Sequence, residues 1–166
     1  MKKFWNYLFF STWHVLGDFV RKFIDKPIYY FLFKISWYRK NRKKVKSEVD
    51  KISQNEIVGT NILYAYYFML TSMDIFLSII AFYFIYFFNI DFSGSFVFYF
   101  TLASIFFLSC FINERLISWN KSGYLKYFKE FEKERNKFRE CLLVFLFHFG
   151  ILFFAILSVY FTLFYK

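Results

Sequence analysis

The sequence predicts an all-α, polytopic helical membrane protein with three transmembrane helices, on three observations. Hydrophobic residues make up 58% of the 166 residues and aromatic residues 29%, more than a soluble domain of this length can bury. Three apolar runs (57–90, 96–112 and 141–165) are long enough, or nearly so, for a bilayer core that takes ~20 helical residues. The net charge of +10 lies almost wholly outside these runs.

The placement of the basic residues predicts the topology. Lys and Arg crowd the chain before residue 57 and the loop 113–140, whereas the connector 89–95 has none and carries Asp91. The positive-inside rule therefore puts the N-terminus and the 113–140 loop in the cytoplasm and the connector outside. Few Ala, Gly and Pro beside many Phe, Ile, Lys, Asn and Tyr are typical of an AT-rich gene, so we expect a bacterial inner membrane.

Residues 1–26 are predicted to form an amphipathic helix that lies in the membrane interface. Apolar side chains recur every three and four residues from Trp5 to Phe23. The opposite stripe is expected to be polar and holds Tyr7, Ser11, His14, Asp18, Arg21 and Asp25. A fourth span over these residues is the alternative, but it would place Lys2 and Lys3 outside and bury charge in lipid.

Residues 27–56 are predicted to be a basic juxtamembrane segment. A break is expected at Asp25-Lys26-Pro27, with Pro27 in the first turn of a new helix. Six of the eight residues from 39 to 46 are basic: Arg39, Lys40, Arg42, Lys43, Lys44 and Lys46. This patch could bind a partner, nucleic acid or anionic lipid, and the interpretation that we favour is a headgroup-contacting cluster that sets the topology. A helix from Ser47 is expected to run on into the first span.

Residues 57–166 are predicted to form the bundle, with a cytoplasmic helical hairpin over 113–140. The first span is expected to cross lipid over 68–88, and the second, which holds Thr101, Ala103, Ser104, Ser109 and Cys110, is expected to be the packing centre. The hairpin carries an apolar stripe of Tyr124, Phe128, Phe131 and Phe138. Its cover could be the other hairpin arm, residues 47–58, a second copy or a soluble partner, so we assign it to partner docking or self-association.

The sequence offers little chemistry. It has no phosphate-binding Gly loop, no metal-spaced His and Cys set and no nucleophile motif, so we expect no enzyme and no catalytic, cofactor or metal site. Cys110 and Cys141 are expected to pack as small apolar residues. Asp74 and His148 lie inside predicted spans at a similar depth, where ionisable groups are costly. They form either a proton or ion path or a hydrogen-bonded packing contact, and we favour the second.

The chain combines a few spans with a basic cytoplasmic portion and comes from an AT-rich gene. In this architecture it resembles the small membrane subunits of mobile-element antiviral defence or phage-exclusion systems. No motif accompanies this resemblance. The function expected from the sequence is a non-enzymatic, self-associating subunit that docks a cytosolic partner as anchor, sensor or membrane-acting effector. The alternative is a pore with Asp74 and His148 near the path. The expected partners are anionic lipid headgroups, further copies of the chain and a cytosolic protein, and nucleic acid is not expected.

Overall fold

The computed structural model describes the chain except residues 54, 56–58, 89–94, 118–122 and 165–166. Every element in the described part is helical, which confirms the all-α prediction. In chain order the helices are α1 (Lys2–Val20), the π-helix η1 (Arg21–Asp25), α2 (Lys26–Leu32), α3 (Ser36–Lys40), α4 (Arg42–Ser53), α5 (Thr60–Phe87), α6 (Ser95–Ile117), α7 (Tyr124–Phe131), the 3-10 helix η3 (Glu132–Glu134) and α8 (Lys137–Phe164).

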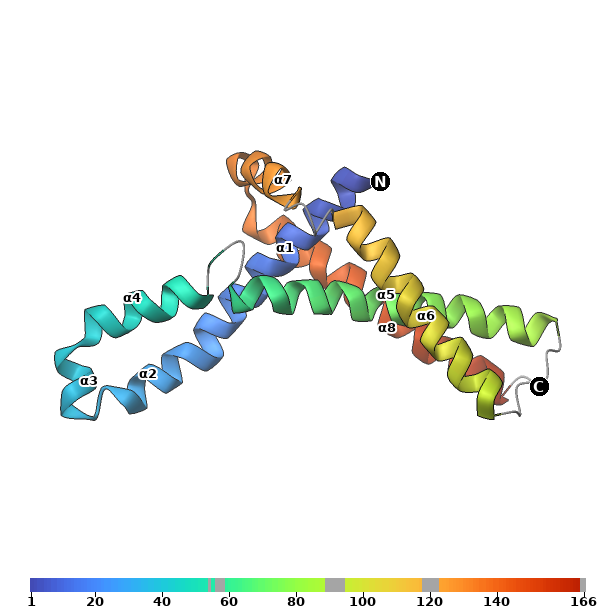
Figure 1. The fold of residues 1–166 in the computed structure, drawn as a ribbon, viewed down its shortest axis with the longest axis horizontal. Coiled ribbons are helices and arrows are strands. Elements are labelled where there is room, and N and C mark those ends of the chain that lie inside the picture. The colour runs from blue at the N-terminus through green and yellow to red at the C-terminus, as the bar shows by residue number, and fades with distance from the viewer. Residues whose placement is uncertain (54, 56–58, 89–94, 118–122, 165–166) are drawn as a thin grey trace.

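Helices α5, α6 and α8 are each long and apolar enough to cross a membrane, so the chain is an integral membrane protein as predicted. Helix α6 continues to Ile117, which confirms that the second span extends beyond residue 112. We call the end of the bundle at Thr60, Ile117 and Lys137 the junction end, and the opposite end the far end (Figure 1). Helix α5 is central and packs against both α6 and α8.

Helix α1 is the hub of the molecule. It crosses the spans near the junction end and contacts α5, α6, α7 and α8 (Figure 1). Its residues from Leu8 to Trp13 are all buried. The predicted polar stripe is therefore wrong at Ser11, which is fully buried, because neighbours surround this part of α1 on all sides rather than on one face.

Pro27 lies in the first turn of α2 as expected, but the expected break before it is absent. Helix α1, η1 and α2 follow one another from Lys2 to Leu32 with helical backbone at each join. Proline has no N–H and its ring crowds the carbonyl four residues earlier, so it normally kinks or ends a helix. The π-helical turn just before Pro27 widens the hydrogen-bond ladder at this point, which lets the helix continue.

The helix from Ser47 does not run on into the first span, contrary to expectation. Helix α4 ends at Ser53, and α5 starts anew at Thr60 after Gly59, whose backbone is extended. Helices α2, α3 and α4, together with η1, form a hairpin that projects from the junction end (Figure 1). We call residues 21–53 the arm, and among its side chains from 21 to 52, whose burial the structure describes, none is fully buried.

The second span is not the packing centre, which corrects another expectation. Of its five small residues only Ser109 is buried, while Ala103 and Ser104 face outward. The buried hydrophobic cluster instead joins α1 to α5, the end of α6 and α7. Small residues allow close helix approach but do not compel it, and here bulky side chains of α1 fill the space.

Candidate functional site: a polar seam, a membrane groove and a basic arm

His148 lies at the centre of a buried polar seam between α1, α5 and α8. Its Nε2 is 3.2 Å from the Thr12 hydroxyl oxygen, and its Nδ1 is 2.5 Å from the Ser72 hydroxyl oxygen. The aromatic rings of Phe68 and Phe147 contact the imidazole edge to face. Three helices thus meet on one side chain, and the partners of His148 are Thr12 and Ser72 rather than Asp74.

The hydrogen atoms of this seam can be assigned from its geometry. The Thr12 hydroxyl donates to the carbonyl of Leu8 at 2.8 Å, so it accepts from His148 Nε2–H. A neutral imidazole then needs a donor at Nδ1. The Ser72 hydroxyl lies 3.0 Å from the Phe68 carbonyl and 2.5 Å from this nitrogen, and its one proton goes to the nearer acceptor, Nδ1. All polar atoms of the seam are satisfied without placing a charge inside the bundle.

A second set of polar contacts binds the start of α1 to the end of α6. The Asn6 amide nitrogen donates to the carbonyls of Lys2 and Leu116, both at 2.8 Å. Trp5 Nε1 donates to the Asn113 side-chain oxygen at 3.0 Å. Because the last carbonyls of a helix have no partner within it, Asn6 satisfies a group that lipid could not.

Charged side chains gather where α1 meets α7, η3 and α8. His14 Nε2 is 3.2 Å from a Glu132 carboxylate oxygen, and Arg135 lies within ion-pair distance of Glu132 and of buried Glu140. Burial lowers the pKa of His14, and the Arg135 charge lowers it further, while Glu132 opposes both. Lys3 pairs with Glu130 across the same junction. One ion pair, Lys3–Glu130, and one contact of His14 with Glu132 thus join α7 and η3 to α1.

The predicted apolar stripe on α7 is covered by α1. The covers expected from the sequence were the other hairpin arm, residues 47–58, a second copy or a soluble partner, but not this helix. Phe9 contacts the rings of Tyr124 and Phe128, and Tyr7 contacts that of Phe131. Tyr124, Phe128 and Phe131 are buried, so the stripe offers no surface to a partner or a second copy; Phe138 alone of the set stays exposed. The sequence missed this because α1 had been placed at the membrane interface.

Asp74 lies apart from the seam, in a groove between α5 and α8. The groove is lined by Thr71, Asp74, Ile75, Ser78, Ile79, Phe82, Ala155, Ser158 and Val159. One carboxylate oxygen of Asp74 is buried, yet it has no hydrogen-bond partner among the described residues. The structure thus gives the two predicted intramembrane residues different roles. His148 is fully engaged within the chain, and Asp74 is left with an unused acceptor.

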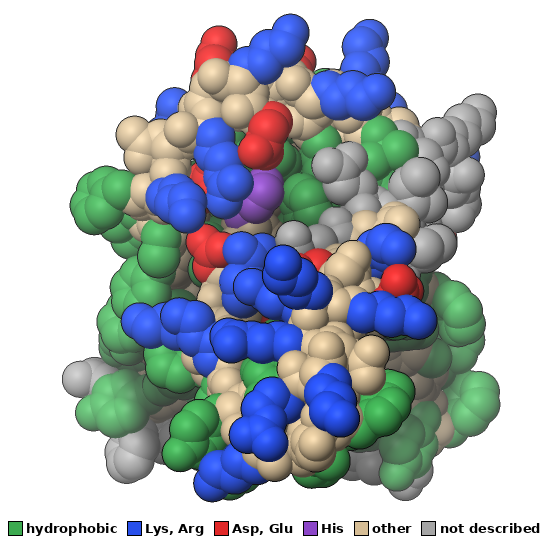
Figure 2. All heavy atoms as spheres, turned by 90° about the vertical axis from the view of Figure 1, so that its left-hand side faces the viewer, with side chains coloured by type: hydrophobic (Ala, Val, Ile, Leu, Met, Phe, Trp, Pro, Cys, Tyr) green, Lys and Arg blue, Asp and Glu red, His purple; other side chains and the backbone are tan. Residues whose placement is uncertain are grey.

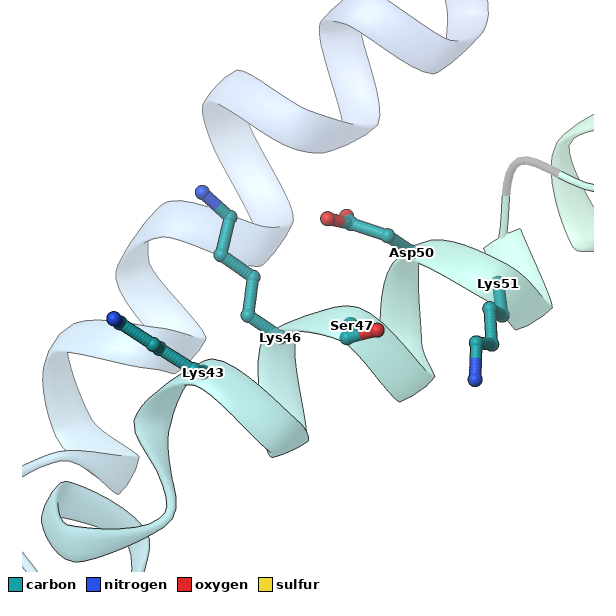
Figure 3. Close-up of a pocket in the computed structure, with 5 residues that line it drawn as sticks. All are labelled: Lys43, Lys46, Ser47, Asp50 and Lys51. Carbon is teal, nitrogen blue, oxygen red and sulfur yellow. The ribbon is translucent and has the colours of Figure 1, made fainter.

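The six residues of the predicted basic patch lie together on α3 and α4 of the arm, and all are exposed: Arg39, Lys40, Arg42, Lys43, Lys44 and Lys46. Figure 2 looks at the molecule from the arm side and shows Lys and Arg gathered over this face, flanked by hydrophobic side chains. Two of the six, Lys43 and Lys46, line a hollow on α4 together with Ser47, Asp50 and Lys51. Lys43 and Lys46 both reach toward the α1–α2 helix (Figure 3).

Thr12, Ser72 and Asn6 are the site residues that sequence reasoning missed. All three are polar residues within apolar runs, which is the signal that could have identified them. Nowhere in the described ranges do three His, Cys, Asp or Glu residues gather as a metal site would require. Comparisons of the chain with protein-family models, curated proteins and solved structures find no match.

Proposed function

We propose that the chain is a non-enzymatic inner-membrane subunit that self-associates in the bilayer and presents helices to a cytosolic protein partner. The observation that carries the proposal is the unused carboxylate oxygen of Asp74 in the α5–α8 groove. A buried carboxylate without a partner is costly in lipid. A second copy would bring its own α5–α8 surface to the same place. The Ser78 hydroxyl lines that surface, and the hydroxyls of Thr71 and Ser158 could reach Asp74 by turning from the carbonyls of their own helices.

Substitution at Asp74 tests the self-association. Asp74→Leu removes every polar contact, whereas Asp74→Asn keeps hydrogen-bonding capacity and abolishes ionisation. We expect Asp74→Leu to weaken association by about 0.6 to ~2 kcal/mol per contact and Asp74→Asn to associate nearly normally. Thr101→Val is the control, since the Thr101 hydroxyl donates to Val97 within its own helix. Native mass spectrometry in nanodiscs measures the outcome, and a monomeric parent protein would refute self-association.

The junction end is the proposed cytoplasmic end, because the arm and α7 carry the basic residues. Its outward-facing charged surface is held rigidly by α1, which suits an anchor or sensor for a soluble partner. The likeness in plan to small subunits of antiviral defence systems fits this role. Cysteine labelling in intact cells tests the orientation. Lys126→Cys should be protected from an impermeant reagent and Phe96→Cys should react, and the reverse pattern would refute the orientation.

A pore is the second candidate, and the same groove favours it. Thr71, Asp74, Ser78 and Ser158 place polar groups along two spans, and an oligomer could turn them toward a common axis. His148 would not line such a path, because Thr12 and Ser72 already occupy both of its nitrogens. Liposomes loaded with an ion-sensitive dye separate the candidates. A leak that Asp74→Asn abolishes, with the oligomer intact, would replace the anchor by the pore.

A further inference from the structure

The arm exposes a set of large apolar side chains, and their exposure to water is energetically unfavourable. Phe31 is 65% exposed, Trp37 61% and Ile35 54%. Phe23, Ile24 and Ile28 continue this exposed set along η1 and α2. Contiguous exposed apolar surface of this kind marks a protein or membrane contact. None of the described helices outside the arm covers these side chains.

Cations stand beside the aromatic rings of the arm. Lys34 Nζ is 4.8 Å from the centroid of the Tyr30 ring and 5.5 Å from that of Phe31. The guanidinium of Arg42 is 5.2 Å from the Phe33 ring, and Lys22 Nζ is 5.3 Å from the Phe23 ring. Apolar bodies with adjoining cationic heads are the side-chain arrangement found at the boundary between acyl chains and headgroups.

The charge of the arm is strongly one-sided. Residues 21–53 hold eleven Lys and Arg against three Asp and Glu, so they carry most of the net charge of +10. A hollow on the surface of α4 is lined by three lysines, Lys43, Lys46 and Lys51, together with Ser47 and with Asp50 as the acidic group (Figure 3). Burial and the charge of Asp50 raise the pKa of the Asp25 carboxyl, which indicates that η1 and α4 approach each other here.

We propose that the arm lies on the anionic surface of the bilayer that the chain spans, with its aromatic side chains among the acyl-chain ends and its Lys and Arg on lipid phosphates. We assign the bilayer as the partner of this surface because the arm is joined directly to the first membrane span. Helix α4 ends at Ser53, and the first span begins at Thr60. A short connection of this kind keeps the arm close to the headgroups. The hollow beside Lys43 and Lys46 seats one headgroup phosphate.

The test uses the full-length chain with Cys110 and Cys141 replaced by serine and a single cysteine, Trp37→Cys, carrying a polarity-sensitive fluorophore. The protein is placed in nanodiscs of phosphatidylcholine alone or mixed with phosphatidylglycerol, with brominated acyl chains as quenchers. We expect strong quenching in the anionic discs. Each basic residue near an anionic surface contributes on the order of a fivefold gain in binding. The triple variant Lys43→Glu, Lys44→Glu, Lys46→Glu should therefore reduce docking on the order of a hundredfold.

The matched control is Lys126→Glu, Lys129→Glu, Lys133→Glu, which makes the same charge change on α7 and η3 and should leave quenching intact. Unchanged helicity and unfolding show that each variant folds. Equal quenching in neutral discs, or quenching that survives the α4 reversal, would overturn the proposal. So would an unquenched arm that instead binds RNA or an acidic peptide through the same lysines. These outcomes are independent of Asp74, so they are distinguishable from a failure of self-association.

Discussion

At the junction end of the bundle α1 fills the space beside α5, α6 and α8, whereas at the far end the same three spans continue without α1. Beyond Met73 no described residue of α5 is buried, and on α8 only Ser158 is buried after His148. Both ends are rich in Phe, so residue type does not distinguish them. Side chains of the three spans are buried inside the protein only where α1 packs against them, and lipid covers the rings that α1 does not reach. Phe side chains are stable both in the protein interior and in lipid, whereas Asn6 and Thr12 need the hydrogen-bond partners that the interior provides.

The largest expected effect comes from removing a buried ring at the junction. Phe9→Ala should destabilise the fold by about 3–5 kcal/mol, because Phe9 is fully buried against Tyr124 and Phe128 and leaves a cavity. Phe107→Ala is the matched change at an exposed ring of α6 and should cost less than about 0.5 kcal/mol. Unfolding in mixed micelles measures both free energies. Equal losses would show that the two environments are not energetically different.

The next effect is the coupling across the polar seam. His148→Leu should cost only modestly, because the Thr12 hydroxyl keeps its bond to the Leu8 carbonyl and the Ser72 hydroxyl can donate instead to the Phe68 carbonyl, 3.0 Å away. A double-mutant cycle of His148→Leu with Thr12→Val isolates the contact between α8 and α1. We expect a coupling of about 0.6 to ~2 kcal/mol. A coupling of zero would mean that apolar packing alone holds α1 in place.

A pair of glycines gives a smaller and opposite effect. A Cβ added at Gly17 would lie 3.3 Å from the Asn61 side chain, whereas one added at Gly150 would meet nothing within 4 Å. Gly150→Ala should gain up to about 1 kcal/mol, because alanine favours a helix. Gly17→Ala should gain less or lose, since Asn61 is buried and must shift. The same unfolding assay compares them, and a larger gain at Gly17 would contradict the tight junction.

The smallest expected effect is a pH dependence at His14. Because the folded protein lowers the pKa of His14 below its ordinary value of 6.5, the unfolded chain binds a proton first as the pH falls. Stability should therefore decline below pH 6.5 as the medium is acidified toward the folded pKa. Opposing contributions of Arg135 and Glu132 keep this effect small. His14→Gln should reduce the slope of the free energy of unfolding against pH. An unchanged slope would mean that other groups cause the pH dependence.

Sequence reasoning predicted the spans well, because hydropathy and length follow directly from bilayer thickness. It also predicted helical structure within 113–140, where α6 continues to Ile117 and α7 begins at Tyr124, since both follow from local patterns. It failed where local signals met tertiary packing. Ser11 was expected to face outward because a polar residue on an amphipathic pattern usually does, and Pro27 was expected to break a helix that a π-turn carries through.

The candidate site divides in the same way. Asp74 and His148 could be found from sequence, because ionisable residues are rare in spans. Their separation into a groove and a seam could not, since it depends on which face of α5 meets α1. The basic patch of the arm was visible as a charge run, but its pairing with exposed aromatic rings requires the hairpin of α2 and α4.

The unbroken helix from Lys2 to Leu32 makes the hub and the arm one mechanical part. Thirty-one residues at ~1.5 Å each give a rod of about 45 Å, held at one end by the seam and continued at the other into the hairpin of the arm. Such a rod acts as a lever. A small tilt of α1 against His148 becomes a displacement several times larger at the arm tip, and a force on the arm returns to the spans as torque on Thr12 and Asn6.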